Sequence, residues 1–591
     1  MNPLLRRWHV SLCFFVFTPF AASADFQPEE RFRRPIALSW TDEGLLAVAN
    51  RDSGSVSLVD VDKGAVLSET SFGKKLTDLA SHPNGRFLLV SDEERSRLVL
   101  LEARGSTLVE RDRLEVEHSP VDLAIHPDGR YVLVSSLWAR RSSLVSIDAD
   151  RAKLLLKQVA DLPFPPRRQW ISKAEDRLVV ADAFADQLAV LSLPDLRLLE
   201  RRVLPGHNVG GLFLAPNKKE LLVSHQILNP HVPTTRSRIF WGNLMENCIT
   251  AVELEDLFDH RPRRDSSSFS RWKRYPVGEN GKGAGEPGTM VQGKSGIFAI
   301  AIRGTGEIAM SDALGGEWRR VNAGRRLVDV ILHKDGNRAF FADVYGEAIR
   351  VVDLEKRELL GSISMGPTPK PGLLQRGEAL FHDSRVSLDG WFSCNSCHTG
   401  GHTSGRLNDN FDDHSFGTPK RVPSLLGTAE TGPWTWNGLQ GSLTTQVRQT
   451  LATTLLNGER KFGRVSREDE EALVSFLFTL PIPPPLAEAR REKLGPDFSK
   501  GKLLFGKVGC NECHRNTLLT SSDEYDVGLV DEAGNRYFNP PSLLGVSQRD
   551  LFFHDASARS IREVLDDAGH PDGGGLTKGQ LRLLETYLRA L

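Results

Sequence analysis

The chain has 591 residues, of which 40% are hydrophobic and 26% are charged, a composition typical of a soluble globular protein with several domains. Its 75 basic and 76 acidic residues give a formal charge of −1. This balance argues against a nucleic-acid partner, because such proteins carry a strongly basic face.

The first 24 residues have the pattern of a secretory signal peptide. Arg6 and Arg7 form a basic start, residues 10–20 a short apolar core, and Ala22-Ser-Ala24 a small-residue cleavage site. The apolar run is too short to span a bilayer, and no later stretch approaches a spanning length. We therefore expect a periplasmic protein, exported by a cleavable signal and without a membrane span.

The region 25–366 repeats a unit of short apolar strands separated by turns. The first three copies contain the turns Asp42-Glu-Gly44, His82-Pro-Asn-Gly85 and His126-Pro-Asp-Gly129, whose glycines are 41 and 44 residues apart. This period is typical of a four-stranded propeller blade, and seven copies predict about seven blades closed in a ring. The turns and the strands after them resemble the YVTN-type, lactonase-like β-propellers.

The repeat is irregular in two places. A long insertion, roughly 227–294, interrupts the fifth unit; we expect it to cover the C-terminal half or to be a plain surface excursion. Gly306 and Gly336, interpreted as the sixth and seventh turn glycines, are only 30 residues apart. Counts of six or eight blades therefore remain open.

The C-terminal half contains the pattern Cys-X-X-Cys-His twice, 116 residues apart, as Cys394, Cys397, His398 and as Cys510, Cys513, His514. This is the attachment signature of c-type haem, in which both thiols bond the vinyl groups and the histidine ligates the iron. The alternatives are a zinc site or a redox dithiol. Zinc pairs usually lie closer together, and neither alternative needs a histidine after both second cysteines. Two covalently bound haem c groups are expected.

Two proline-rich segments mark the predicted domain boundaries: a linker at 365–372 and a semi-rigid spacer at 480–485. Helical periodicity covers 469–480, with Ser466 as the expected N-cap, and also 576–591. The fold class is thus multidomain β and α. The predicted parts are a signal peptide (1–24), a β-propeller (25–366) and two mainly α-helical cytochrome c domains (367–485 and 486–591).

Residues from about 373 to 591 resemble the bacterial di-haem cytochrome c peroxidases, a family that includes the MauG-like enzymes. The resemblance implies that His414, sixteen residues after His398, is the second ligand of the first haem. It also implies that Trp436, followed by Asn-Gly, relays electrons between the haems, with a plain core aromatic as the alternative. Gln446, ten residues further, corresponds to a catalytic glutamine on the peroxide side.

The chain departs from the family pattern at several positions. Leu456 stands where the family has a catalytic glutamate, so that Glu459, about one helical turn further, is the candidate substitute. No methionine follows Met365, so the second haem must use histidine, tyrosine or an open site, and His570 lies near the expected position. Arg421 occupies the place of an asparagine associated with an interdomain calcium ion, which argues against calcium here.

Together these features predict an exported di-haem oxidoreductase that reduces hydrogen peroxide. The resemblance implies a small electron-donor protein, a cytochrome or cupredoxin, as its partner. Electrons would pass from the second haem to the first. Two alternatives remain open: a bis-histidine electron-transfer cytochrome without peroxidase activity, and a MauG-like oxidase of a protein or small molecule.

Overall fold

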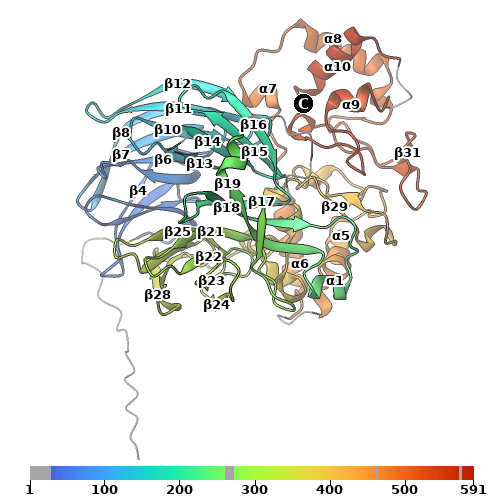
Figure 1. Ribbon diagram of the computed structural model, residues 1–591. Coiled ribbons are helices and arrows are strands. Elements are labelled where there is room, and N and C mark those ends of the chain that lie inside the picture. The colour runs from blue at the N-terminus through green and yellow to red at the C-terminus, as the bar shows by residue number, and fades with distance from the viewer. Residues whose placement is uncertain (1–27, 173, 175, 260–271, 460–462, 571–574) are drawn as a thin grey trace, which may run out of the picture.

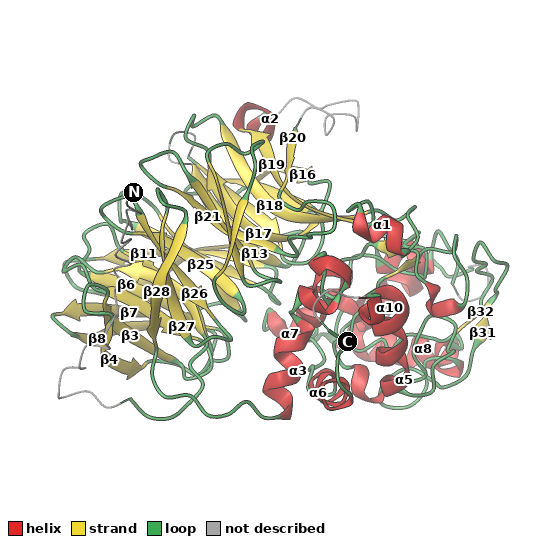
Figure 2. Ribbon diagram, turned by 90° about the horizontal axis from the view of Figure 1, so that it is seen from below, coloured by secondary structure: helices red, strands yellow, loops and turns green. Residues whose placement is uncertain are grey.

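The computed structural model describes residues 28–172, 174, 176–259, 272–459, 463–570 and 575–591, so the predicted signal peptide lies outside the described residues. Figure 1 shows a β-propeller with a mainly helical C-terminal region beside it, and Figure 2 shows that the helices of this region gather on one side of the propeller. The predicted fold class is confirmed. No described helix is long and apolar enough to cross a membrane.

The described propeller consists of seven four-stranded antiparallel sheets, each formed by four consecutive strands. The strands are β1 (Pro35–Trp40), β2 (Leu46–Asn50), β3 (Ser55–Asp60), β4 (Ala65–Ser71); β5 (Leu76–Ser81), β6 (Phe87–Asp92), β7 (Arg97–Arg104), β8 (Thr107–Glu115); β9 (Pro120–Ile125), β10 (Tyr131–Ser136), β11 (Arg141–Asp148), β12 (Lys153–Asp161); β13 (Pro166–Ser172), β14 (Arg177–Asp182), β15 (Gln187–Ser192), β16 (Leu198–Val203); β17 (His207–Leu214), β18 (Glu220–Leu228), β19 (Met245–Glu253), β20 (Lys273–Pro276); β21 (Pro287–Gln292), β22 (Phe298–Ile302), β23 (Glu307–Ser311), β24 (Arg319–Asn322); and β25 (Leu327–Leu332), β26 (Arg338–Asp343), β27 (Ala348–Asp353), β28 (Glu358–Ser364).

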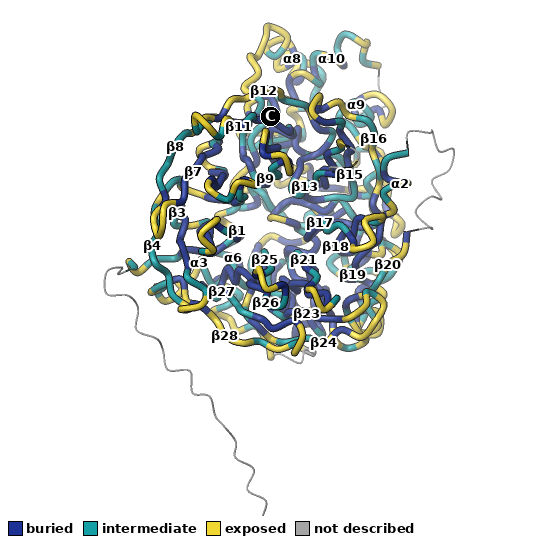
Figure 3. Tube along the Cα trace, turned by 60° about the vertical axis from the view of Figure 1, so that its left-hand side comes forward, coloured by how far each residue is buried: buried dark blue, intermediate teal, exposed yellow. Residues whose placement is uncertain are grey.

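The first strand of each blade lies at the centre, and β25 contacts β1 to close the ring. The second strands, such as β2, β6 and β10, are wholly buried because neighbouring blades cover both of their faces. The outer strands β4 and β16 contain no buried residue. Figure 3 shows the same gradient, with buried residues along the inner strands and exposed ones at the rim. The apolar periodicity that predicted the blades therefore reflects packing between blades.

The prediction of about seven blades is confirmed, but the interpretation of one turn was wrong. Gly306 lies between β22 and β23, whereas Gly336 lies between β25 and β26. The turn equivalent to Gly336 in the sixth blade contains Gly296, 40 residues earlier, so the normal period is kept. Because β22 and β23 are equally short and apolar, the sequence did not show which of them was the second strand of the blade.

The expected insertion at 227–294 is largely regular structure. It includes β19 and β20 of the fifth blade and β21 of the sixth, while short connections extend from the sheet. The connection at 229–244 contains α1 (Arg236–Phe240) and bonds to the C-terminal region through Thr234 N and Asp409 O, 2.9 Å apart. In the connection at 277–286, Gly283 N donates a hydrogen bond to Asp389 O of the C-terminal region at 2.8 Å. These connections join the two parts of the molecule.

The C-terminal region has two halves of similar construction. The helices of the first half are α3 (Leu373–Phe381), α4 (Cys394–Cys397), α5 (Leu443–Gln449) and α6 (Arg467–Leu477), with the short strands β29 (Leu407–Asn408) and β30 (Lys420–Arg421). The second half contains α7 (Leu486–Ala489), α8 (Pro496–Lys507), α9 (Ile561–Leu565) and α10 (Lys578–Leu588), with β31 (Tyr525–Asp526) and β32 (Tyr537–Phe538). A further short helix, α2 (Leu254–Phe258), lies in the propeller.

A glycine fixes the main helix crossing in each half. A Cβ atom on Gly377 of α3 would lie 2.0 Å from the carbonyl oxygen of Ala472 in α6. A Cβ atom on Gly501 of α8 would lie 2.1 Å from that of Leu583 in α10. Only glycine permits so close an approach of two helix backbones. Both glycines belong to the pattern Gly-X-X-Leu-Phe, so the two halves share the same short sequence motif at their main helix crossing.

Candidate functional site

Cys394, Cys397 and His398 line one cavity in the first half of the C-terminal region. Its walls are mostly apolar and include Phe381, Phe392, Val422, Leu443, Val447, Leu451, Leu455 and Leu473. His398 Nδ1 lies 2.9 Å from the carbonyl oxygen of Pro423, which fixes the ring and leaves Nε2 for a metal. Burial lowers the pKa of His398 to about 4, so the imidazole is neutral, as a metal ligand must be.

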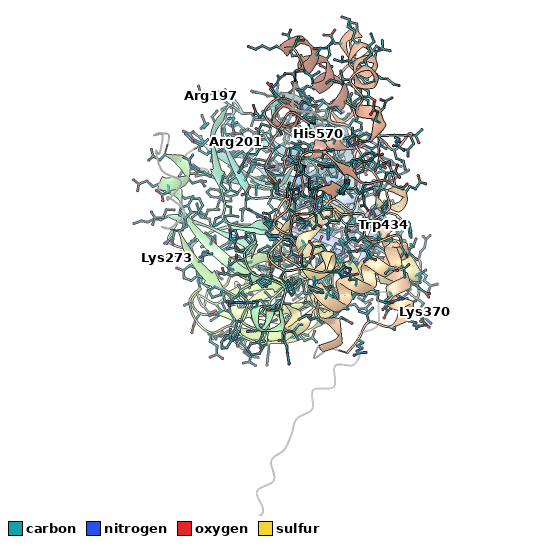
Figure 4. All side chains as sticks on the ribbon, turned by 90° about the vertical axis from the view of Figure 1, so that its right-hand side faces the viewer. Arg197, Arg201, Lys273, Lys370, Trp434 and His570 are labelled. Carbon is teal, nitrogen blue, oxygen red and sulfur yellow. The ribbon has the colours of Figure 1, made fainter. Side chains whose placement is uncertain are left out.

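Cys510, Cys513 and His514 line a second cavity, built in the same way. His514 Nδ1 lies 3.1 Å from the carbonyl oxygen of Leu519, and burial lowers the pKa of His514 to about 4. The structure also brings His570 into this cavity. Its ring packs edge-on against Phe553, with centroids 5.8 Å apart. Figure 4 labels His570 in this half and Trp434 in the other.

The residues of both cavities fit a haem group. The two cysteine pairs line separate cavities, so they do not form one four-cysteine zinc site. Burial raises the pKa of Cys394 and of Cys397 to about 12, and that of Cys510 to about 11, which disfavours the thiolates that zinc or a redox dithiol needs. A planar apolar ring held by thioether bonds needs no thiolate in the folded protein.

A polar pair, Asp412 and Gln446, lies in the first cavity. Gln446 Nε2 donates to Asp412 Oδ2 at 3.0 Å and to Thr450 Oγ1 at 3.2 Å, and Thr453 Oγ1 donates to Asp412 Oδ1 at 3.4 Å. Gln446 Oε1 is buried and accepts no hydrogen bond. Burial raises the pKa of Asp412 to about 6. The sequence pattern predicted Gln446 but not Asp412, whose only signal in the sequence was its position two residues before His414.

His414 does not line this cavity in the structure. It is exposed, follows the turn Phe411–Asp413 with a φ of 64°, and packs edge-on against Phe411. Its role as an iron ligand stays a prediction that would need this segment to rearrange. Glu459 ends the turn Asn457–Glu459, and its side chain lies outside the described residues. Leu456, at the family's glutamate position, packs against the apolar core of the first half.

Five residues line both cavities: Arg421, Trp436, Asn539, Pro541 and Arg549. Trp436 Nε1 donates to the carbonyl oxygen of Arg421 at 2.7 Å, and the Arg421 guanidinium lies 5.0 Å from the centre of the Trp436 ring. The structure therefore places Trp436 between the two cavities, as a relay would require. Trp434 lines only the first cavity.

The propeller holds the loop that carries the first cysteine pair. Glu286, between β20 and β21, accepts hydrogen bonds from Ser393 Oγ and, at 2.9 Å, from Asn395 Nδ2. His207 Nε2 lies 2.8 Å from the carbonyl oxygen of Ser396, a distance at which it donates a hydrogen bond. Asn247 Nδ2 donates to the carbonyl oxygen of Trp391 at 2.9 Å. These propeller residues had no recognisable pattern in the sequence, because they come from separate blade segments.

The second half is also fastened to the propeller. Arg140 Nη1 lies 2.6 Å from Asp550 Oδ1, and Gln548 Nε2 donates to the carbonyl oxygen of Trp138 at 2.9 Å. His402 packs edge-on against Trp138 and Phe184, whose rings stack on each other, and it lies outside both cavities. Both halves thus contact the propeller directly.

Comparison with known proteins agrees with this geometry. Residues 373–472 match the sequence profile of the di-haem cytochrome c peroxidases. These residues carry the first Cys-X-X-Cys-His motif, and the C-terminal region is therefore similar to this family. A relative is the methylamine utilization protein MauG of Methylorubrum extorquens, 28% identical in an alignment of 257 residues that covers 34% of this chain and 70% of the relative. Another is the cytochrome c551 peroxidase of Nitrosomonas europaea, 22% identical in an alignment of 244 residues that covers 33% of this chain and 72% of the relative.

Among solved structures, a hydrazine synthase chain of Kuenenia stuttgartiensis aligns with 56% of this chain and 98% of its own length, at 20% identity and a TM-score of 0.47. Members of the di-haem family are haem-containing oxidoreductases, and the similarity of the C-terminal region to them supports haem as its cofactor.

Proposed function

We propose that this protein is an exported di-haem c-type cytochrome that reduces hydrogen peroxide with electrons from a small periplasmic donor protein. The observation that carries the proposal is the polar pair in the first cavity, Asp412 and Gln446. His398 is the only histidine among the described residues that line this cavity. A haem held by His398 would therefore meet no second histidine from the described lining of this cavity, which would allow its iron to react with peroxide.

Haem c in the first cavity would be bonded to Cys394 and Cys397 and ligated by His398. In the second cavity it would be bonded to Cys510 and Cys513, with His514 and His570 as ligands. Bound haem supplies an iron centre that takes up electrons and breaks the O–O bond. The second cavity is lined by His514, His554 and His570, which can supply two iron ligands for electron transfer, whereas the single histidine beside a carboxylate in the first cavity suits reaction with a small molecule.

The reaction consumes two electrons and two protons for each peroxide molecule and gives two water molecules. Breaking the O–O bond requires a proton to move from the near to the far oxygen, and a positioned carboxylate performs this step in general acid–base catalysis. Asp412 Oδ2 accepts from Gln446 Nε2 and Asn410 Nδ2, which orient the carboxyl group, so Asp412 would hold that proton on Oδ1. Asp412 thereby takes the role of the glutamate that Leu456 replaces. Trp436 offers the path between the two cavities.

The test is peroxide-dependent oxidation of a reduced small cytochrome c by the purified, pre-reduced protein. Asp412→Asn is expected to lower the rate by about 100-fold or more, because positioned acid–base groups contribute roughly 10²–10⁴-fold. Asp150→Asn, an exposed position in the propeller, is the matched control and keeps the rate. Visible spectra of both variants should equal those of the unchanged protein.

No turnover by the unchanged protein would refute the peroxidase function. If the unchanged protein turns over and Asp412→Asn does so equally fast, the function stands and the role of Asp412 is wrong. Peroxide consumption without donor oxidation, together with oxidation of an added protein, would favour a MauG-like oxidase. Failure of the reduced protein to bind cyanide or carbon monoxide would favour a cytochrome with electron transfer alone.

A further inference from the structure

We propose that Arg421 and Arg549 form one anion-binding site between the two cavities, which binds a propionate carboxylate of each haem and couples their reduction potentials electrostatically. The inference rests on the two haems proposed above, but not on peroxide chemistry. It starts from the fact that both arginines line both cavities.

The Arg421 side chain is held rigidly and is only 4% exposed. Its backbone N–H donates to the carbonyl oxygen of His554 at 2.6 Å, and its Nε donates to that of Phe553 at 3.0 Å. The ring of Trp436 packs against the guanidinium. The two terminal nitrogens make no hydrogen bond to the described residues, so they are available to an acceptor in the cavities.

Neither arginine has an ion pair with a carboxylate among the described residues. Burial and the charge of Arg549 lower the pKa of Arg421 to about 9, and the charge of Asp555 opposes this shift only in part. Burial lowers the pKa of Arg549 to about 10, and its side chain reaches only the carbonyl oxygen of Leu544, at 3.5 Å. Arg421 is buried and Arg549 is half-buried; two such cations without a counter-ion are costly, so the pair favours a bound anion.

The other cation that lines these cavities is already neutralised. Lys420 Nζ lies 2.6 Å from Asp413 Oδ2 and 3.1 Å from Asp531 Oδ2. Among the described lining residues of the second cavity, Arg421 and Arg549 are the only lysine or arginine side chains. The remaining walls there are mainly apolar and suit the ring of a haem, while its carboxylates need a polar partner.

A carboxylate is the anion that the planar guanidinium fork fits best, because it can accept two parallel hydrogen bonds. Each haem carries two carboxylates on one edge. Since both cavities present the same two free cations at their shared wall, both haems are expected to turn this edge toward it. A charge change at either arginine then acts on both haems at once.

The test is a spectroelectrochemical titration of the full-length, haem-loaded protein, without peroxide or donor. The variants are Arg421→Gln, Arg549→Gln and the charge-conserving Arg421→Lys, and the covalent haem content of each is measured first. Removing a positive charge destabilises the reduced haem, so each glutamine variant should lower both reduction potentials. Arg421→Lys should restore most of the shift. Arg448→Gln, at an exposed arginine of α5, is the control and should shift neither potential.

A shift of one potential alone, or of neither, in a variant that keeps both haems overturns the inference. Repeating the titration with and without phosphate at equal ionic strength separates the sources of the anion. Potentials that depend on phosphate would mean that a free anion fills the site, which also overturns the assignment to propionates. Fewer than two covalent haems in the unchanged protein would instead refute the cofactor assignment of the proposed function.

Discussion

Replacement of Glu286 tests how far the propeller stabilises the C-terminal region. This glutamate is fully buried, with 0% of its surface exposed. Besides the hydrogen bonds from Ser393 and Asn395, its Oε2 lies 3.2 Å from Arg326 Nη2. Glu286→Ala would therefore leave two donors of the cysteine loop and one buried cation without this acceptor. Glu286→Gln keeps the shape and one acceptor oxygen, but removes the charge.

The size of the effect follows from these contacts. Breaking a buried ion pair by removing one partner costs about 3–5 kcal/mol. Hydrogen bonds to a charged group contribute about 1.5–3 kcal/mol each, but the three interactions share one carboxylate and do not add. We expect Glu286→Ala to lower the free energy of unfolding of the C-terminal region by about 3–5 kcal/mol. Glu286→Gln should lower it by about 1–2 kcal/mol, because one hydrogen bond is rearranged.

The assay is urea unfolding of the haem-loaded protein, followed by Soret circular dichroism for the C-terminal region and by far-ultraviolet circular dichroism for the propeller. Glu102→Ala is the control, because Glu102 is a buried carboxylate on β7 that pairs with Arg86, Arg104 and Arg111. It should destabilise the propeller signal first. The reasoning is refuted if Glu286→Ala lowers the free energy of unfolding followed at the Soret band by less than about 0.5 kcal/mol. It is also refuted if this decrease is no larger than the one that Glu102→Ala causes.

Three further predictions follow from the described contacts. The double variant Cys510→Ala/Cys513→Ala, which removes both thioether bonds, should reduce covalently bound haem from two groups to one, as measured by mass spectrometry, and unchanged haem content would contradict the attachment site. Trp436→Phe should slow electron transfer between the haems in rapid-mixing spectroscopy while both haems remain, since it lines both cavities; an unaltered rate would exclude it as the relay. Burial and the charge of Asp550 raise the pKa of Asp182 to about 7, whereas an aspartate in the unfolded chain has a pKa of about 4. The protonated side chain therefore contributes fully to the free energy of unfolding below about pH 4, and this contribution is lost as the pH rises through 7. Asp182→Asn should therefore raise the melting temperature at pH 8 but hardly at pH 4, and an equal gain at both values would show another cause.

Local patterns in the sequence determined much of the architecture. The blade period and the two Cys-X-X-Cys-His motifs depend only on neighbouring residues, and both were recognised directly. The helix expected at 469–480 is α6 (Arg467–Leu477), and Ser466 Oγ accepts from Asp469 N at 3.2 Å, as the expected cap should. Such features are readable because helix caps and strand periods are set within one turn or one strand.

Counting along the chain was less reliable in the loops. The spacing of sixteen residues singled out His414, yet the structure turns the chain with a positive φ at that residue and leaves it outside the first cavity. Asp412, two residues earlier, lines the cavity instead. A count of residues fixes a distance along the chain but not the direction of a side chain in an irregular segment.

Only the tertiary structure decided which distant residues meet. Gln446 and Asp412 are 34 residues apart, Arg421 and Arg549 are 128 apart, and Glu286 is 107 residues from Ser393. Each pair joins separate helices, strands or domains, and no periodicity links its members. The sequence by itself thus determined the elements and the cysteine and histidine motifs. The shared wall between the cavities and the attachment to the propeller arise only when the domains pack together, because such contacts depend on the packed geometry and not on spacing.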